Sequence, residues 1–192
     1  MKQRTFLTQW ITATVIGYLA IGFDLAYPPI SIVLFIGSGL WVSLLQWLVL
    51  RQVLQDKPHS QDVFDWVHKG WRLAMIGLFF SAVIIVFSLI FASDPKNPDG
   101  RIWLLSLSLY PLFFSIGQWR FLRHFSQRSA WWIVVGFVSI SLGWLSAITT
   151  IWIFHTRDLP LFLGGIASGG IGGLLQGGIS GIGLVYLLKF RK

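Results

Sequence analysis

The sequence contains no cysteine and no glutamate. Without cysteine the chain cannot form disulfides, thiolate metal sites or cysteine nucleophiles. Its only carboxylate side chains are seven aspartates, and charged residues of all kinds make up 11% of the 192 residues. Few groups are therefore present for acid–base catalysis or for oxygen-ligand metal binding. The same scarcity of charge argues against a water-soluble fold of this size.

The sequence is instead rich in long hydrophobic runs, and hydrophobic residues make up 55% of the chain. A hydrocarbon core about 30 Å thick needs a helix of roughly 20 apolar residues to cross it. Six segments meet this requirement without a charged residue near their centres. They predict an all-α, polytopic integral membrane helical bundle that forms a single domain over residues 1–192. The expected transmembrane helices are 8–26, 30–50, 71–92, 102–122, 131–154 and 161–188.

The basic residues predict the orientation of this bundle, because short loops rich in Lys and Arg stay on the cytoplasmic side. Twelve basic residues fall on one face of the predicted bundle and three on the other. Both termini are therefore expected in the cytoplasm, and the net charge of +8 reflects topology rather than nucleic-acid binding. A basic face beside the bilayer attracts anionic lipids, and the candidate contacts are Arg120, Arg123 and Arg128.

A short phrase occurs twice in the chain, as QWLVLR at residues 46–51 and QWRFLR at residues 118–123. Each copy lies where an even-numbered predicted helix leaves the membrane on the cytoplasmic side. The Trp and Arg of each copy are four residues apart, which places an indole at the interface and a guanidinium beyond it on one helix face. The glutamines, Gln46 and Gln118, then either bond a neighbouring helix or line a polar path.

The repetition also indicates a duplicated unit, because a basic loop and an interfacial Trp follow each copy. We therefore expect three tandem helical hairpins that share one orientation. A third and weaker echo, LLQ at residues 174–176, places Gln176 near the middle of the membrane.

The last predicted helix, 161–188, holds ten of the chain's 20 glycines. Glycines at intervals of four residues form a smooth stripe, the pattern of a glycine zipper, on which another helix backbone can pack closely. This helix is expected to be the packing centre of the bundle or of a homo-oligomer. Alternatively it slides or lines a pore, with Gln176 and Ser180 as polar contacts. The stripe consists of Gly165, Gly169, Gly173, Gly177 and Gly181.

Ionisable side chains are missing from the predicted spans, although catalysis and ion coupling inside a membrane usually require them. Potential metal ligands gather only in the loop 51–70, in a spacing that matches no metal motif: His59, Asp62, Asp65 and His68. That loop is instead expected to form a short interfacial helix with an apolar face against lipid: Val63, Phe64, Val67 and Trp71. The sequence thus predicts no catalytic, cofactor-binding or metal-ligating residue, and no enzyme.

Three stretches of the chain, LLQWLVLR, SIGQWRFLRHFSQRSAWWIV and GGLLQGGISGIGLVYLL, resemble a group of uncharacterised multi-pass membrane proteins of cyanobacteria and other bacteria. The resemblance implies a location in the bacterial cytoplasmic membrane or in a thylakoid membrane. It brings no catalytic residues to this chain.

These observations favour a non-catalytic membrane scaffold or accessory protein, because features that form helix contacts are abundant and intramembrane charge is lacking. Its expected partners are the lipid bilayer, anionic lipids at the cytoplasmic face, and a second copy or another membrane protein. The alternative is a small passive transporter or channel that uses the glycine-rich helix and the intramembrane glutamines. A membrane enzyme or cofactor carrier has the least support.

Overall fold

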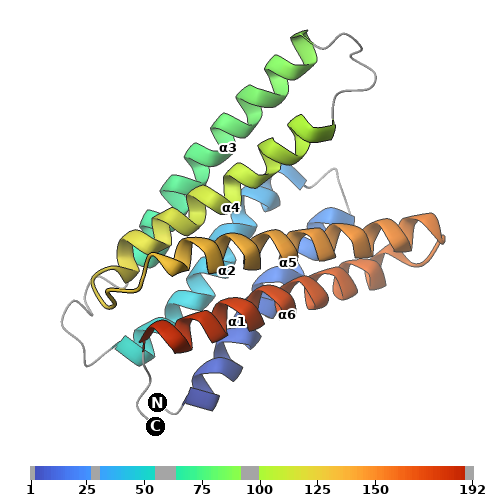
Figure 1. Ribbon diagram of the computed structural model, residues 1–192. Helices are drawn as coiled ribbons and strands as arrows, with labels where there is room; N and C mark the ends of the chain where they lie inside the picture. Colours follow the sequence, from blue (N-terminus) through green and yellow to red (C-terminus); the bar gives the residue numbers. More distant parts are fainter. Residues whose placement is uncertain (1–2, 27–30, 55–63, 92–99, 189–192) are drawn as a thin grey trace.

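The structure is a computed structural model that describes residues 3–26, 31–54, 64–91 and 100–188. Within these ranges it describes every side chain except those of residues 24–25, 31–38, 88–89, 91 and 100–107. The described residues form six α-helices and no strand, which confirms the all-α prediction (Figure 1). The helices are α1 (Gln3–Ala26), α2 (Ser31–Leu54), α3 (Asp65–Phe91), α4 (Gly100–Leu122), α5 (Trp131–Thr156) and α6 (Leu161–Leu188).

Four of these helices contain described stretches long and apolar enough to cross a membrane, as expected of a membrane protein. Helix α2 adds a shorter apolar stretch, Gly39–Leu54. Helix α6 runs for 28 residues although many of them are glycine. In hydrocarbon the backbone has no other hydrogen-bond partners, so the helix persists despite its poor intrinsic propensity. The four long stretches are Gln3–Phe23, Asp65–Phe87, Trp131–Thr156 and Leu161–Leu188.

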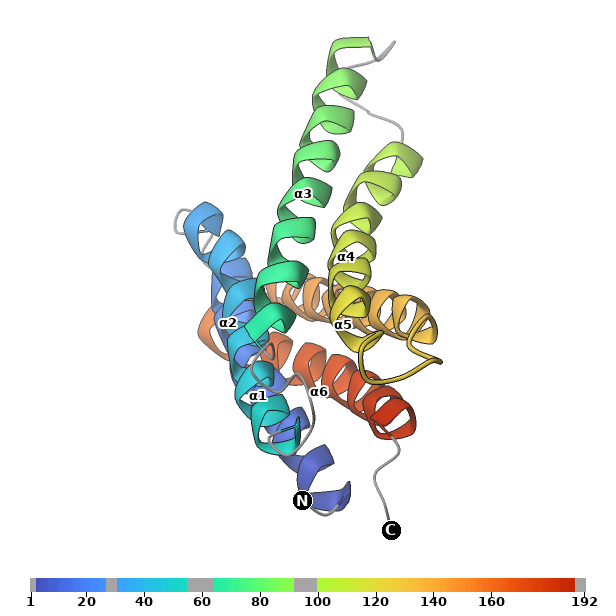
Figure 2. The same ribbon diagram turned by 90° about the vertical axis from the view of Figure 1, so that its left-hand side faces the viewer.

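The six helices converge at one end of the molecule. The beginnings of α1, α3 and α5 lie there together with the ends of α2, α4 and α6 (left in Figure 1). We call this the cluster end, because the largest cluster of buried hydrophobic side chains lies there and draws on every helix. Towards the opposite end, the pair α3–α4 diverges from the pair α5–α6 (Figures 1 and 2).

The most extensive helix contact joins α1 to α6, the first and last helices of the chain. The contacts of α3 with α4, of α5 with α6 and of α1 with α2 follow in that order. Smaller contacts join α4 to α5 and α2 to α3. The pair α3–α4 therefore contacts the other four helices less extensively than its two members contact each other.

Residues 65–71 are the first two turns of α3 and not a separate interfacial helix. Asp65 opens the helix and forms an ion pair with Lys69 one turn later, at 2.5 Å. Trp66 and Val67 are 0% and 2% exposed, so they pack inside the protein. The prediction that Val67 lies against lipid is therefore wrong, whereas Phe64 is 53% exposed. Val63 lies outside the described residues.

Candidate functional site

Gln46 on α2 is 1% exposed and bonds a neighbouring helix. Its side-chain nitrogen donates to the Thr14 hydroxyl of α1, at 3.1 Å. Thr14 donates in turn to the Trp10 carbonyl oxygen of its own helix, at 2.8 Å. Because the hydroxyl proton is already used, Thr14 can only accept from Gln46, and the direction of the bond is fixed.

Gln118 holds the corresponding place on α4 and is 2% exposed. Its side-chain oxygen accepts a hydrogen bond from the indole Nε1 of Trp132 on α5, at 3.1 Å. An indole N–H only donates, so the amide oxygen must face it. Both copies of the repeated phrase thus supply a buried amide that bonds an adjacent helix. Interhelical bonds of this kind contribute about 0.6–2 kcal/mol each in membranes.

The charged ends of the two phrases face outward at the cluster end. In the first copy the Arg51 guanidinium carbon lies 5.7 Å from the centre of the Trp47 ring, within reach of a cation–π contact. In the second copy Arg120 and Arg123 are exposed. Arg128, in the loop that follows, donates from Nη1 to the Tyr186 hydroxyl of α6, at 2.9 Å. That bond positions its guanidinium beside the end of α6.

The glycine stripe of α6 faces the backbone of α1. A methyl group built on Gly169 would lie 2.6 Å from the Tyr18 carbonyl oxygen, and one on Gly173 would lie 2.5 Å from the Val15 Cα. These neighbours are backbone atoms, which cannot rotate aside as a side chain can. All five predicted stripe positions have α1 atoms close to them: Gly165, Gly169, Gly173, Gly177 and Gly181.

A second face of α6 packs on α5. The Ser168 hydroxyl donates to the Ala147 carbonyl oxygen, at 3.0 Å. A methyl group on Gly172 would lie 2.8 Å from the Gly143 carbonyl oxygen. Helix α6 therefore packs between α1 and α5 along most of its length, and its remaining face is exposed. Two further glycines, Gly170 and Gly178, have no atom of the described residues within 4 Å of an added methyl group and face away from both.

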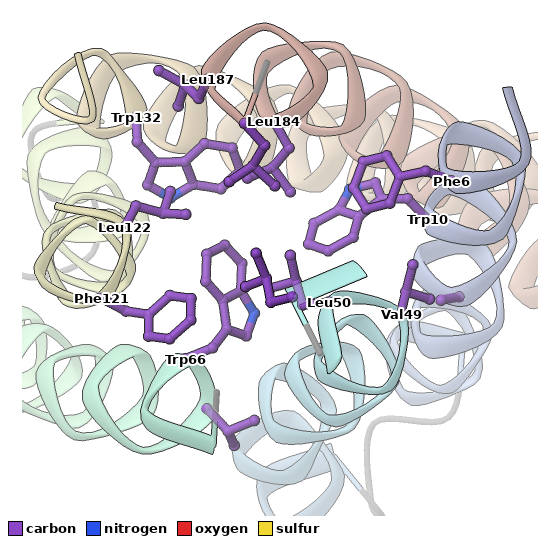
Figure 3. Packing of buried hydrophobic residues seen from close by; sticks show 14 residues of the cluster. Phe6, Trp10, Val49, Leu50, Trp66, Phe121, Leu122, Trp132, Leu184 and Leu187 are labelled. Atoms are coloured by element: carbon purple, nitrogen blue, oxygen red, sulfur yellow. The ribbon is translucent and has the colours of Figure 1, made fainter. Parts of the chain in front are cut away.

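The sequence did not predict the tryptophan cluster, which we define as Trp10, Trp66 and Trp132 with Phe6 and Phe121 (Figure 3). Trp66 of α3 is its centre. The Trp66 ring centre lies 5.8 Å from that of Trp10, 5.5 Å from that of Trp132 and 6.0 Å from that of Phe121. One side chain thus joins α3 to α1, α4 and α5.

A hydrogen-bond chain runs from this cluster toward the middle of α6. The Trp10 indole donates to the Ser180 hydroxyl, at 2.9 Å, and Ser180 donates to the Gln176 carbonyl oxygen, at 2.6 Å. Gln176 itself is 5% exposed and lines a small cavity with Tyr18 and Tyr110. Gln176 is one of the three glutamines predicted from the sequence as polar contacts, and the structure places it at this cavity.

Among the described residues no group of three or more His or Asp side chains is placed to hold a metal ion. His59 and Asp62 lie outside those residues. No protein-family model, curated protein or solved structure matches this chain.

Proposed function

We propose that this protein is a non-catalytic membrane scaffold or accessory protein. The observation that carries the proposal is the packing of α6, whose glycine stripe lies on α1 and whose second face lies on α5. In a pore-lining helix at least one of these two faces would be exposed to water. In a sliding helix at least one would lie on a partner that can move. Gln46 and Gln118, the other candidates for a polar path, use their amides in bonds to adjacent helices.

The proposal includes six membrane crossings arranged as three consecutive hairpins. Helices α2 and α4 have 24 and 23 residues. At 1.5 Å per residue each is about 35 Å long, enough for a hydrocarbon core of about 30 Å. Each consecutive pair, α1–α2, α3–α4 and α5–α6, is in contact. We place the basic cluster end in the cytoplasm of a bacterial cell, at the cytoplasmic or a thylakoid membrane.

A cysteine-labelling experiment tests this orientation, because a single introduced cysteine is the only thiol in the chain. Gln127, in the loop before α5, and Leu159, in the turn after it, are both exposed. In spheroplasts a membrane-impermeant maleimide is expected to label Leu159→Cys and not Gln127→Cys. Detergent should then make both reactive. If Gln127→Cys alone is labelled before detergent is added, the protein has the opposite orientation in the membrane.

Anionic lipid is the partner that the cluster end favours. Arg123 and Arg128 belong to a loop with no acidic side chain, and Tyr186 holds the Arg128 guanidinium in place. Each cation near an anionic membrane surface contributes on the order of 1 kcal/mol of binding. We propose that lipid headgroups bind this loop, and that the exposed apolar helix faces meet acyl chains or a membrane-protein partner.

Native mass spectrometry of protein extracted gently from its own membrane tests the scaffold proposal. We expect a stoichiometric protein partner or a defined oligomer, with anionic lipid bound. The variant Arg123→Ala/Arg128→Ala should retain less of that lipid, whereas Arg157→Ala, in the turn between α5 and α6, should not. A protein that purifies alone and makes liposomes permeable to small solutes would instead support the passive transporter.

A further inference from the structure

A small cavity lies where five helices meet, between the tryptophan cluster and the diverging end of the molecule. It gives the centre of a water molecule about 20 Å³ of space. One water needs roughly 10–15 Å³ on this measure, whereas pockets for organic ligands have volumes of about 300 Å³ or more. The walls come from α1, α2, α4, α5 and α6: Tyr18, Ile21, Gly39, Val42, Tyr110, Phe114, Ile140, Trp144 and Gln176.

The polar groups in these walls point to a ligand. The Tyr18 side chain is 1% exposed, and its hydroxyl has no hydrogen-bond partner among the described residues. A buried hydroxyl without a partner is unfavourable, and native proteins rarely retain one. The fold nevertheless makes room for it, since a methyl group on Gly143 would lie 2.8 Å from the Tyr18 hydroxyl oxygen.

Tyr110 reaches the same cavity from the opposite pair of helices. Its hydroxyl lies directly against Gly39 of α2, where any larger side chain would displace it. Gln176 of α6 also lines the cavity, and its side chain carries an amide. Tyrosine hydroxyls and glutamine amides can each donate and accept, so together they offer both kinds of bond to a small molecule. The remaining walls are mostly apolar, so such a molecule is expected to lie beside these three polar side chains.

We propose that Tyr18, Tyr110 and Gln176 bind one buried water molecule in this cavity. Buried waters in proteins typically form about three hydrogen bonds, the number that these three side chains can supply. The water satisfies the Tyr18 hydroxyl and links α1 and α6 to α4. It thereby adds a polar connection between the α3–α4 pair and the rest of the bundle, beyond the tryptophan cluster.

A double-mutant cycle on the two tyrosines distinguishes a hydrated cavity from a dry one. If water is bound, Tyr18→Phe removes a hydrogen bond and should lower the melting temperature by about 2–4 °C. If the cavity is dry, the same change removes an unpartnered hydroxyl and should raise the melting temperature. In the Tyr110→Phe background the loss should be smaller, because the bridge is already broken. Tyr186→Phe removes an exposed hydroxyl that accepts from Arg128, so its change in melting temperature measures the loss of a surface hydrogen bond for comparison.

Proton-detected solid-state NMR in lipid bilayers can detect the bound water directly in the unmodified chain. With its four tyrosines isotopically labelled, magnetisation should pass from water to the Tyr18 ring. The Tyr18→Phe variant identifies that signal by its disappearance. The proposal is overturned if water transfer reaches the exposed Tyr186 but not Tyr18. A raised melting temperature for Tyr18→Phe, or strictly additive effects of the two substitutions, would also overturn it.

Discussion

Gly173→Leu is expected to destabilise the protein by more than about 3 kcal/mol, because the new side chain must enter the contact between α6 and α1. Even the first carbon of that side chain would lie 2.5 Å from the Val15 Cα. A packed interior has no void to absorb it, so the two backbones have to separate. Equilibrium unfolding in mixed micelles, or steric trapping in bilayers, measures the loss.

The same helix provides the control. Gly178→Leu adds an identical side chain where no atom in the described part of the chain lies within 4 Å of the first carbon. Leucine has a better helix propensity than glycine, so this variant should be as stable as the parent or slightly more stable. Gly173→Ala should fall between the two leucine variants. Equal stability of Gly173→Leu and Gly178→Leu would mean that α1 does not lie on the stripe.

The stripe could be recognised in the sequence because its spacing of four residues is a local pattern, but its partner could not. Helix α1 contributes only one glycine to the contact, Gly22, whose own added methyl group would collide with the Gly165 carbonyl oxygen. Other α1 residues in the contact, such as Val15 and Leu19, have ordinary apolar side chains. Nothing in them distinguishes α1 from the other helices, so the pairing of the first and last helices becomes visible only in three dimensions.

For Gln46 and Gln118 the sequence predicted the depth in the membrane and the need for a partner. It could not identify Thr14 or Trp132 as those partners. A threonine hydroxyl in a helix usually bonds its own helix four residues back, as Thr14 does with Trp10, and its spare capacity to accept a second bond depends on tertiary contact. Trp132 follows a second tryptophan that is 64% exposed, so composition alone did not separate the buried ring from the interfacial one.

The buried role of Trp66 was missed because hydropathy assigned residues 65–69 to a loop, where Asp65, His68 and Lys69 lower the average. A different signal extends across that boundary. Small residues recur at helical spacing from Gly70 onward, and they and Trp66 are buried on the same face of α3: Trp66, Gly70, Ala74, Gly77 and Ser81. A stripe of small residues that continues past the charged ones predicts that the helix, and its packed face, begins earlier than the hydropathy indicates.

The buried position of Trp66 predicts the second large effect, a loss of stability in Trp66→Ala. Removal of a fully buried tryptophan typically costs about 3–5 kcal/mol, since the lost contacts leave a cavity. Trp66 joins α3 to three other helices, and the remaining contact of the α3–α4 pair with the bundle runs mainly between α4 and α5. The substitution should therefore loosen that pair as well as lower the free energy of unfolding. Pulsed EPR between spin labels at Phe79 on α3 and Leu145 on α5, both exposed, should show a broadened distance distribution.

Two matched variants test how much of the stability loss in Trp66→Ala comes from the lost ring contacts. Trp66→Phe keeps an aromatic ring and removes an indole nitrogen that has no partner among the described residues, so its loss should be well below that of the alanine variant. Trp131→Ala removes a tryptophan that is 64% exposed at the same end of the bundle, and it should change unfolding by less than about 1 kcal/mol. If Trp66→Ala proves as mild as Trp131→Ala, and the spin-label distances stay narrow, the tryptophan cluster does not join the two parts of the bundle. A selective loss at Trp66 would instead mean that the cluster end fixes how far the α3–α4 pair diverges from the other helices.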